Sequence, residues 1–444
     1  MKKEIYLPYF ENKKVTVMGL GLLGRGIGDT AFLASCHTDL TVTDKKTKEE
    51  LSSSLEALNE YKNINYKLGS HELSDFENRD FILKAAGVPL NSDFIKHAQD
   101  KNIPVYMSAA LVCDIVMKNL PNVVIIGITG TRGKSTTTQM IAHILRENGC
   151  KVHIGGNVRG IANLPLLEVI EDDEYLVLEL DSWQLQGFGD MKNSPHIAVF
   201  TSFMDDHMNY YNCDRELYFN DKAKIYRNQK EGDVLIASQQ AQREIIVRDV
   251  NAEVIVPEVC DFEMKLIGSH NKIAAGLAYE VALQCGLDDE SVRNSIKTFS
   301  AVEGRLEDLG LFKNNVRVFN DNNATTGDAT VAAIKAINEK YNIKPIIILG
   351  GSDKGLDLLP LEKEINENTK AFILLAGTGT DKLNLPKDSM FERLNDCVDE
   401  AFKLATDGDI ILFAPSFASF SKYFNNEYER NDAFVSAVQK YKNN

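Results

Sequence analysis

Short apolar runs alternate with stretches of helical periodicity along the whole chain. The runs are rich in β-branched and aromatic residues, which is typical of strands. Between them, segments such as 136–147 repeat apolar residues three and four positions apart, as amphipathic helices do. This alternation predicts an α/β fold with mainly parallel sheets. The expected strands are Val15–Met18, Leu40–Thr43, Phe81–Lys84, Val123–Ile128, Tyr175–Glu179, Ile197–Thr201, Val234–Ala237, Val316–Asn320, Ile346–Leu349, Ala371–Leu375 and Ile410–Phe413.

The length of the chain, 444 residues, is typical of about three domains. A strand, loop and helix of the nucleotide-binding type begins near Val15, another near Val123 and a third near Val316. We therefore predict three domains, each built on its own sheet. They are a Rossmann-like N-terminal domain (1–106), a central P-loop ATPase-like domain (107–302) and a C-terminal Rossmann-like domain (303–444).

The chain carries 49 basic and 64 acidic residues, a formal net charge of −15. This balance argues against a partner nucleic acid, which would require a basic face. We also expect no membrane partner, because no apolar run reaches the roughly 18 residues of a membrane span. The N-terminus has no apolar signal-peptide core, and the seven scattered cysteines never occur in CxxC spacing. Both features predict a reduced, cytoplasmic protein.

A first glycine-rich loop follows the first expected strand. Gly19, Gly21 and Gly24 have GxGxxG spacing, and Asp44 ends the next strand. Glycines let backbone N–H groups approach a diphosphate at a helix N-terminus, and the acid can accept a hydrogen bond from a hydroxyl. Three interpretations are open: a tight turn without a ligand, a nicotinamide dinucleotide site and a uridine diphosphate site.

A second glycine-rich loop, in VVIIGITGTRGKSTTTQM, carries the strongest signal of the chain. A strand leads into Gly127, Gly130 and Gly133, and Lys134 and Ser135 open a helix. The loop amides and the helix dipole can hold phosphates, Lys134 adds charge at the β and γ phosphates, and Ser135 can bind Mg²⁺. The glycine spacing differs from the usual GxxxxGK, which argues against GTPases and motor ATPases.

This loop and several other segments resemble one family. GITGTRGKSTTT is similar to the ATP loop of the Mur ligase family, which also includes folylpolyglutamate synthase. Further matches follow in order along nearly the whole chain, and they are closest to the ligases that add glutamate to UDP-N-acetylmuramoyl-L-alanine. The matching segments are GGN (155–157), ELDSWQL (179–185), DDHMNYY (205–211), NDKAKIY (220–226), GSHN (268–271), FNDNNATT (319–326), GGSDKG (350–355) and APSFASF (414–420).

The resemblance implies residues for ATP, metal and catalysis. Glu179 ends an apolar strand, where a carboxylate can hold Mg²⁺ together with Ser135. In the family, the lysine that matches Lys222 carries CO₂ as a carbamate. The implied ATP-binding residues are Gly130, Thr131, Gly133, Lys134, Ser135, Thr136, Asn271, Arg305 and Asp321. The implied ligands of two Mg²⁺ sites are Ser135, Glu179, His207 and Lys222, and the implied catalytic residues are Lys134, Asn157, His207 and Lys222.

Ordinary structural interpretations stand beside these roles. Glu179 would be an exposed acid at a strand end, and Lys222 a solvated lysine on a charged segment. Asn271 would cap a helix, a role that can coexist with a contact to adenine. Arg305 would form a surface salt bridge instead of clamping a phosphate.

The resemblance also implies contacts to the other two substrates. The first domain and the start of one central helix would bind the UDP portion of UDP-N-acetylmuramoyl-L-alanine through Gly21, Leu22, Leu23, Asp44, Ser182 and Gln184. Strand and loop ends of the third domain, where open α/β sheets bind ligands, would hold glutamate through Thr325, Lys354 and Ser419.

The chain departs from the family pattern at four places, two of which are single residues. Arg132 stands where Asn is usual, Ala274 where a second Asn follows the His-Asn pair, and 85–87 differs from the usual SxG loop. The largest departure is Asn322-Asn323 in place of Ser-Lys. Since that lysine's charge would lie near the reacting phosphate, its absence affects either the rate or the choice of amino acid.

Taken with the residues, the resemblance implies a monomeric, ADP-forming amide ligase that uses ATP and two Mg²⁺ and acts through an acyl phosphate in peptidoglycan precursor synthesis. D-glutamate is expected as the added amino acid, with L-glutamate as the alternative. Three more distant functions stay open: a folylpolyglutamate-type ligase, a non-catalytic ATP-binding homologue and an NAD-dependent dehydrogenase. The 106-residue N-terminal unit argues against the folylpolyglutamate type, and the second glycine-rich loop argues against the dehydrogenase.

Overall fold

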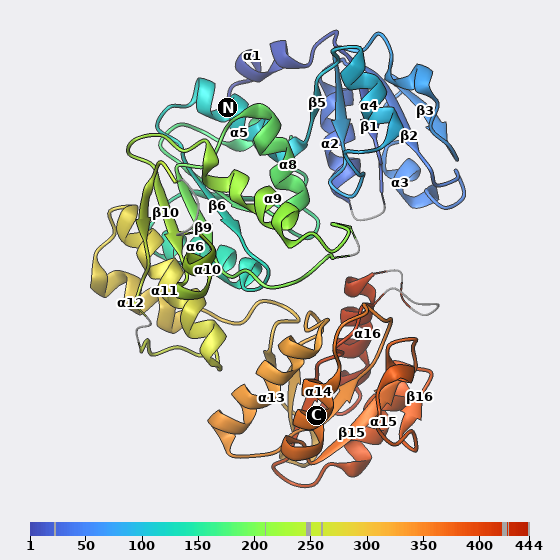
Figure 1. The fold of residues 1–444 in the computed structure, drawn as a ribbon, viewed down its shortest axis with the longest axis vertical. Coiled ribbons are helices and arrows are strands. Elements are labelled where there is room, and N and C mark those ends of the chain that lie inside the picture. Colours follow the sequence, from blue (N-terminus) through green and yellow to red (C-terminus); the bar gives the residue numbers. More distant parts are fainter. Residues whose placement is uncertain are drawn as a thin grey trace. The chain divides into compact units, whose positions relative to one another are not determined.

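The computed structural model describes residues 1–21, 24–208, 210–245, 250–258, 261–419, 424 and 426–442. Its contacts divide the chain into two compact units. The first contains Met1–Cys260 and Ala274–Ser295, and the second contains Asp261–Ile273 and Ile296–Asn444. The first unit holds two sheets and the second holds one, each flanked by helices (Figure 1). The domain boundaries near 106 and 302 stay predictions.

The first sheet is entirely parallel and has the strand order β3-β2-β1-β4-β5. The order reverses beside β1, so the loop that follows β1 lies at a topological switch point, where such sheets bind ligands. The strands are β1 (Lys14–Met18), β2 (Asp39–Asp44), β3 (Ile64–Leu68), β4 (Phe81–Lys84) and β5 (Val105–Tyr106). The helices are α1 (Lys3–Tyr6), α2 (Arg25–Ser35), α3 (Ser52–Ala57) and α4 (Asp93–Asp100).

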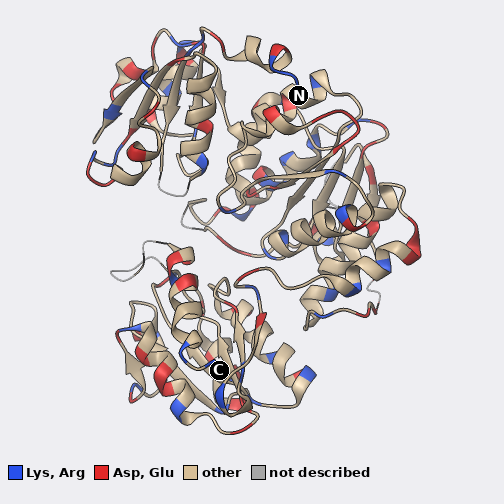
Figure 2. Ribbon diagram, turned by 180° about the vertical axis from the view of Figure 1, so that it is seen from behind, with Lys and Arg blue, Asp and Glu red and all other residues tan. Residues whose placement is uncertain are grey.

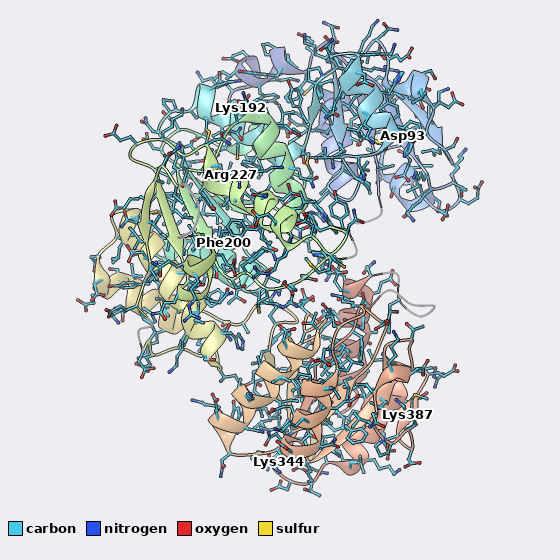
Figure 3. All side chains as sticks on the ribbon, in the orientation of Figure 1. Asp93, Lys192, Phe200, Arg227, Lys344 and Lys387 are labelled. Atoms are coloured by element: carbon cyan, nitrogen blue, oxygen red, sulfur yellow. The ribbon has the colours of Figure 1, made fainter. Side chains whose placement is uncertain are left out.

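The second sheet is also parallel, with the order β11-β10-β9-β6-β8-β7. The phosphate loop follows its central strand β6, and Phe200 on β9 is fully buried beside that strand (Figure 3). The strands are β6 (Val124–Thr129), β7 (Val152–Gly156), β8 (Tyr175–Glu179), β9 (Ile197–Phe200), β10 (Val234–Ala237) and β11 (Glu253–Ile255). The helices are α5 (Ser108–Asn119), α6 (Lys134–Glu147), α7 (Leu166–Val169), α8 (Ser182–Met191), α9 (Arg215–Arg227), α10 (Gln239–Ile245), α11 (Ser269–Gln284) and α12 (Asp289–Thr298).

The third sheet has the order β12-β13-β17-β14-β15-β16, and only its edge strand β12 is antiparallel. The carboxyl ends of β13, β17 and β14 therefore lie side by side. The strands are β12 (Glu307–Leu311), β13 (Arg317–Asn320), β14 (Ile346–Leu349), β15 (Ala371–Leu375), β16 (Met390–Phe391) and β17 (Ile410–Phe413). The helices are α13 (Gly327–Tyr341), α14 (Leu359–Asn368), α15 (Leu394–Leu404) and α16 (Glu427–Gln439).

All eleven expected strands are present, within one residue at each end. The strands that the apolar pattern missed are β3, β5, β7, β11, β12 and β16, and each of them is an edge strand of its sheet. Basic and acidic residues are interspersed over the ribbon (Figure 2). Within the described ranges, no helix is long and apolar enough to cross a membrane.

Candidate active site

The phosphate loop, residues 130–133, joins β6 to α6 and packs against the end of β9. Gly130 has φ 142° and Gly133, at the N-cap of α6, has φ 87°. A Cβ at Gly130 would lie 2.0 Å from Thr201 Oγ1, so only glycine fits there. Gly127, inside β6, leaves room for the Pro195 ring instead. The unusual glycine spacing therefore combines one packing glycine with two loop glycines.

Two lysines converge on one carbonyl oxygen of this loop. Lys134 Nζ donates to Gly130 O at 3.0 Å, and Lys222 Nζ, from α9, donates to the same oxygen at 2.8 Å. Lys222 is only 2% exposed, so the solvated position that its charged segment suggested is wrong. Burial, and then the nearby Lys134 cation, lower the pKa of Lys222 well below its ordinary value, against the opposing carboxylates of Asp181 and Asp206.

The remaining phosphate-loop residues differ in exposure. Thr131 is buried, and its hydroxyl donates to Met204 O at 3.0 Å, so it fastens the loop to residues 202–204. Thr136 is buried in the first turns of α6, whereas Ser135, at the second position of that helix, is partly exposed. Of Thr131, Ser135 and Thr136, Ser135 therefore has the side chain that is most accessible to a ligand.

Glu179 and Asn157 lie together at the carboxyl ends of β8 and β7. Glu179 is 5% exposed, which corrects the exposed strand-end interpretation, and it pairs in register with Ile128 of β6. Asn157 N donates to Glu179 O at 2.6 Å, and Gly156 (φ 84°) allows this close approach, because a Cβ there would lie 2.1 Å from the same oxygen. Glu179 therefore lies beside the phosphate-loop strand.

The acidic loop after β9 carries His207, whose backbone is left-handed at φ 54°. The ring of His207 lies 4.8 Å from that of Trp183, and its Nε2 lies 3.8 Å from Asp206 Oδ2. Arg132, the departure from the family pattern, pairs with Asp206 at 3.2 Å. Arg132 therefore ties the phosphate loop to the segment that presents His207.

The donor set suits Mg²⁺ bound with phosphates more than a metal caged by protein alone. Within the described ranges, no group of three or more His, Cys, Asp and Glu side chains could hold a metal. A carboxylate and a hydroxyl at a phosphate loop are what Mg²⁺ usually takes, because substrate phosphates and water complete its shell. Glu179 and Ser135 fit that requirement, and Lys222 does so only as an anion.

Asp44, an expected substrate contact, accepts hydrogen bonds from the backbone of the first glycine-rich loop. Its Oδ2 accepts from Leu20 N at 2.9 Å and Gly21 N at 3.2 Å, and its Oδ1 accepts from Lys46 N at 2.9 Å. The carboxylate thus braces the first glycine-rich loop from behind. The expected contacts of Leu22 and Leu23 lie outside the described residues.

The starts of α8 and α2 carry further residues of the candidate site. Gln184 forms a capping box with Asp181, since each side chain accepts from the other's backbone N–H, and Ser182 is buried beside them. Arg25 Nη1, at the first position of α2, donates to Asn157 Oδ1. Sequence reasoning missed Arg25, although it directly follows the third glycine of the GxGxxG loop.

In the second unit, the three expected amino-acid ligands lie in the loops that follow the carboxyl ends of β13, β17 and β14. Lys354 Nζ donates to Thr325 Oγ1 at 3.0 Å. Ser352 and Ala418 pair through two backbone hydrogen bonds of 3.0 and 3.1 Å, which places the buried Ser419 beside the loop of Lys354.

The second unit also contains three expected ATP ligands: Asp321 and its neighbour Arg305, and, on a different element, Asn271. Asp321 Oδ1 accepts from Leu306 N at 2.9 Å, beside Arg305, and burial raises the pKa of Asp321 to about 7 although that N–H and the Arg305 cation lower it. Asn271 is the third residue of α11 and donates to Ile267 O at 2.8 Å. The helix-cap interpretation of Asn271 is therefore wrong.

Comparison with known proteins identifies the class. Residues 13–107 match the model of the Mur ligase MurD-like N-terminal domain, and residues 128–265 match that of the Mur ligase middle domain. The solved MurC of Thermotoga maritima covers 96% of this chain and 99% of its own with a TM-score of 0.62 at 17% identity. The ADP complex of MurF from the same organism covers 99% of both chains with a TM-score of 0.61 at 14% identity. These structures confirm the three-domain α/β fold.

Sequence relatives define the family. UDP-N-acetylmuramoylalanine--D-glutamate ligase of Borreliella burgdorferi (strain ZS7) is 34% identical, over 97% of this chain and 99% of its own. The enzyme of that name from Roseiflexus sp. (strain RS-1) is 32% identical, over 97% and 99%. The chain belongs to the Mur ligase family. The prediction of an ATP-dependent, amide-forming ligase is thereby confirmed at the level of the class.

Proposed function

We propose that the protein joins D-glutamate to UDP-N-acetylmuramoyl-L-alanine in cytoplasmic peptidoglycan precursor synthesis, as a monomer, with release of ADP and phosphate. The observation that carries this proposal is the convergence of Lys134 and Lys222 on Gly130 O, in a chain that is similar over 97% of its length to a UDP-N-acetylmuramoylalanine--D-glutamate ligase. The phosphate loop supports ADP formation, because it grips the β and γ phosphates and leaves the terminal one to be transferred.

The chemistry requires activation of a carboxylate, because oxide is a poor leaving group. The carboxylate of the UDP substrate attacks the γ phosphorus of ATP, the bond from that phosphorus to the bridging oxygen breaks, and ADP leaves. The glutamate amine then attacks the acyl phosphate, phosphate leaves, and the amine loses a proton as the amide forms. Lys134 and the loop amides stabilise the charge that develops on the transferred phosphoryl group.

Glu179 and Ser135 would hold one Mg²⁺, and His207 with Lys222 would hold a second. When bound, the metal neutralises phosphate charge. Lys222 can serve as a ligand only after its neutral amine has attacked CO₂ and lost a proton, which leaves a carbamate anion. The lowered pKa of Lys222 favours the neutral amine, and a carbamate would convert its repulsion by Lys134 into attraction.

The substrate roles follow the placement of the residues. Gly21, Ser182 and Gln184 would contact the UDP substrate, while Asp44 holds the loop that receives it. Asn157, fixed by Glu179 and Arg25, would orient the activated carboxylate. Thr325, Lys354 and Ser419 offer hydroxyls and a cation for the two carboxylates of glutamate, and Asn271, Arg305 and Asp321 would bind ATP.

The test is incubation of the protein with ATP, Mg²⁺, UDP-N-acetylmuramoyl-L-alanine labelled with ¹⁸O in its carboxylate, and D- or L-glutamate. Mass spectrometry should show the D-glutamyl product and ¹⁸O in the released phosphate. Label in AMP would overturn the acyl phosphate. Faster ligation of L-glutamate would overturn the D assignment alone, and ATP binding without ligation of any amino acid would overturn the ligase proposal.

A further inference from the structure

Arg430, near the start of α16, is one of the largest fully buried side chains of the protein, with 1% of its surface exposed. Burial lowers the pKa of Arg430 to about 10, so the guanidinium stays charged at neutral pH. In the described part of the chain, no carboxylate forms an ion pair with it, and Glu427 acts on it only at longer range. A buried charge is costly unless hydrogen bonds compensate it, so its contacts need an explanation.

The guanidinium binds two loops of the third sheet. Nε donates to Asn322 Oδ1 and Nη2 to Asn322 O, both at 2.9 Å, so Arg430 holds Asn322 in a two-pronged contact. Nη1 donates to Phe417 O at 3.1 Å. A Cβ at Gly351 would lie 3.5 Å from the same Nη1, so the loop after β14 also packs against the guanidinium.

These loops follow β13, β17 and β14, which are neighbours in the sheet, and they carry the expected ligand residues. Asp321 precedes Asn322 and Thr325 follows it, Ser419 lies two residues after Phe417, and Lys354 lies three after Gly351. One cation thus connects the loops that carry the three expected amino-acid ligands and Asp321, an expected ATP ligand.

Asn322 uses both ends of its side-chain amide in this contact. Its Nδ2 donates to Glu427 O at 2.9 Å, while its two oxygens accept from Arg430. The first half of the departure from Ser-Lys, Asn322, therefore has a structural reason, because its amide bridges the loop and α16. Residues of α16 set its orientation.

We propose that Arg430 is a positioning residue, which acts through Asn322 and Phe417 to hold the loops of the expected amino-acid ligands and of Asp321 in register. The inference rests on the proposed function for its kinetic readout. It predicts that loss of the two-pronged contact weakens binding of glutamate and ATP, but not of the UDP substrate, whose expected ligands lie in the first unit.

The test compares Arg430→Lys with the wild type, well below the melting temperature of each. Lysine keeps the charge but cannot make the planar two-pronged contact. KM for glutamate should rise about tenfold or more, and KM for the UDP substrate should change by less than about twofold. Arg393→Lys, an exposed arginine on the same unit that pairs with Asp396, is the matched control and should leave both constants unchanged.

Asn322→Ala, which removes one prong, should reproduce part of the effect, and the double variant should add little to Arg430→Lys. Hydrogen exchange gives a readout without turnover: peptides covering 320–326 and 414–419 should exchange faster in Arg430→Lys, and β15 should not. A parallel rise of all KM values, or a lower melting temperature with unchanged KM and exchange, would overturn the proposal. A wild type that ligates no glutamate would refute the proposed function. Hydrogen exchange alone would then test whether Arg430 holds these loops.

Discussion

Asp29 offers a test of the junction between α2 and the segment after β7. The carboxylate is 5% exposed, and its Oδ1 accepts from Asn163 N at 2.9 Å and Leu164 N at 2.8 Å. Burial raises the pKa of Asp29 to about 6, although these amides, the Ser108 hydroxyl and the Arg25 cation lower it. A Cβ at Gly28 would lie 2.5 Å from that of Ala162, so the helix packs tightly on this segment.

The direction of the pH effect follows from the raised pKa. The folded protein binds the Asp29 proton more tightly than the unfolded chain, whose carboxyl titrates near 3.8. The stabilisation is therefore complete below pH 3.8 and is lost as the pH rises through about 6. The difference between a pKa of 3.8 in the unfolded chain and about 6 in the folded protein corresponds to ~3 kcal/mol of unfolding free energy lost between acid and alkaline pH.

Asp29→Asn keeps an Oδ1 acceptor for both amides but removes the ionisation. Relative to the wild type, the variant should gain about 2 kcal/mol of stability between about pH 4.5 and about pH 8.5, because part of the total loss has already occurred at pH 4.5. Urea unfolding followed by the fluorescence of Trp183, the single tryptophan, which lies in the same unit, measures this difference. The exposed Asp93 on α4 provides a matched control as Asp93→Asn (Figure 3). Parallel stability curves for Asp29→Asn and wild type would refute the reasoning.

Three further substitutions test the site. Lys222→Ala should lose most activity and regain part of it when a small carboxylate is added, whereas near-normal turnover without the additive would contradict the carbamate. Gly130→Ala should raise KM for ATP about tenfold or more through its collision with Thr201; Gly149→Ala, also at positive φ but with open space around it, should not. Asn323→Lys should speed turnover if the missing cation limits phosphoryl transfer, or shift the D/L preference if Asn323 shapes amino-acid choice; unchanged values for both would show that neither holds.

The interior strands could be predicted from the sequence, and the edge strands could not, for one physical reason. A strand between two neighbours in a parallel sheet is buried on both faces and is therefore a continuous apolar run, as in β14 and β17. The edge strands β3 and β12 contain no fully buried residue, and β5 and β16 have two residues each. Their pairing depends on the neighbouring strand more than on their own composition.

Within the site, local motifs located the phosphate loop, but the burial of Lys222 required the tertiary structure. The charged segment around it suggested a solvated helix. The spacing was nevertheless informative, since Tyr218, Lys222 and Tyr226 lie four residues apart and all three are buried on one face of α9. Arg430 gave no comparable signal, because its partners are 13 and 108 residues away in the chain.

Asp44 shows that the acid of the GxGxxG motif also has a structural role in this protein. In a dinucleotide site, the acid at the end of the second strand accepts from a ribose hydroxyl. Here both oxygens already accept from the backbone N–H groups of Leu20, Gly21 and Lys46. A carboxylate held by three amides would lose those bonds on turning toward a ribose, which leaves the glycine-rich loop without its brace. The geometry therefore favours a role of Asp44 in holding the glycine-rich loop over a role as the main contact of a ribose.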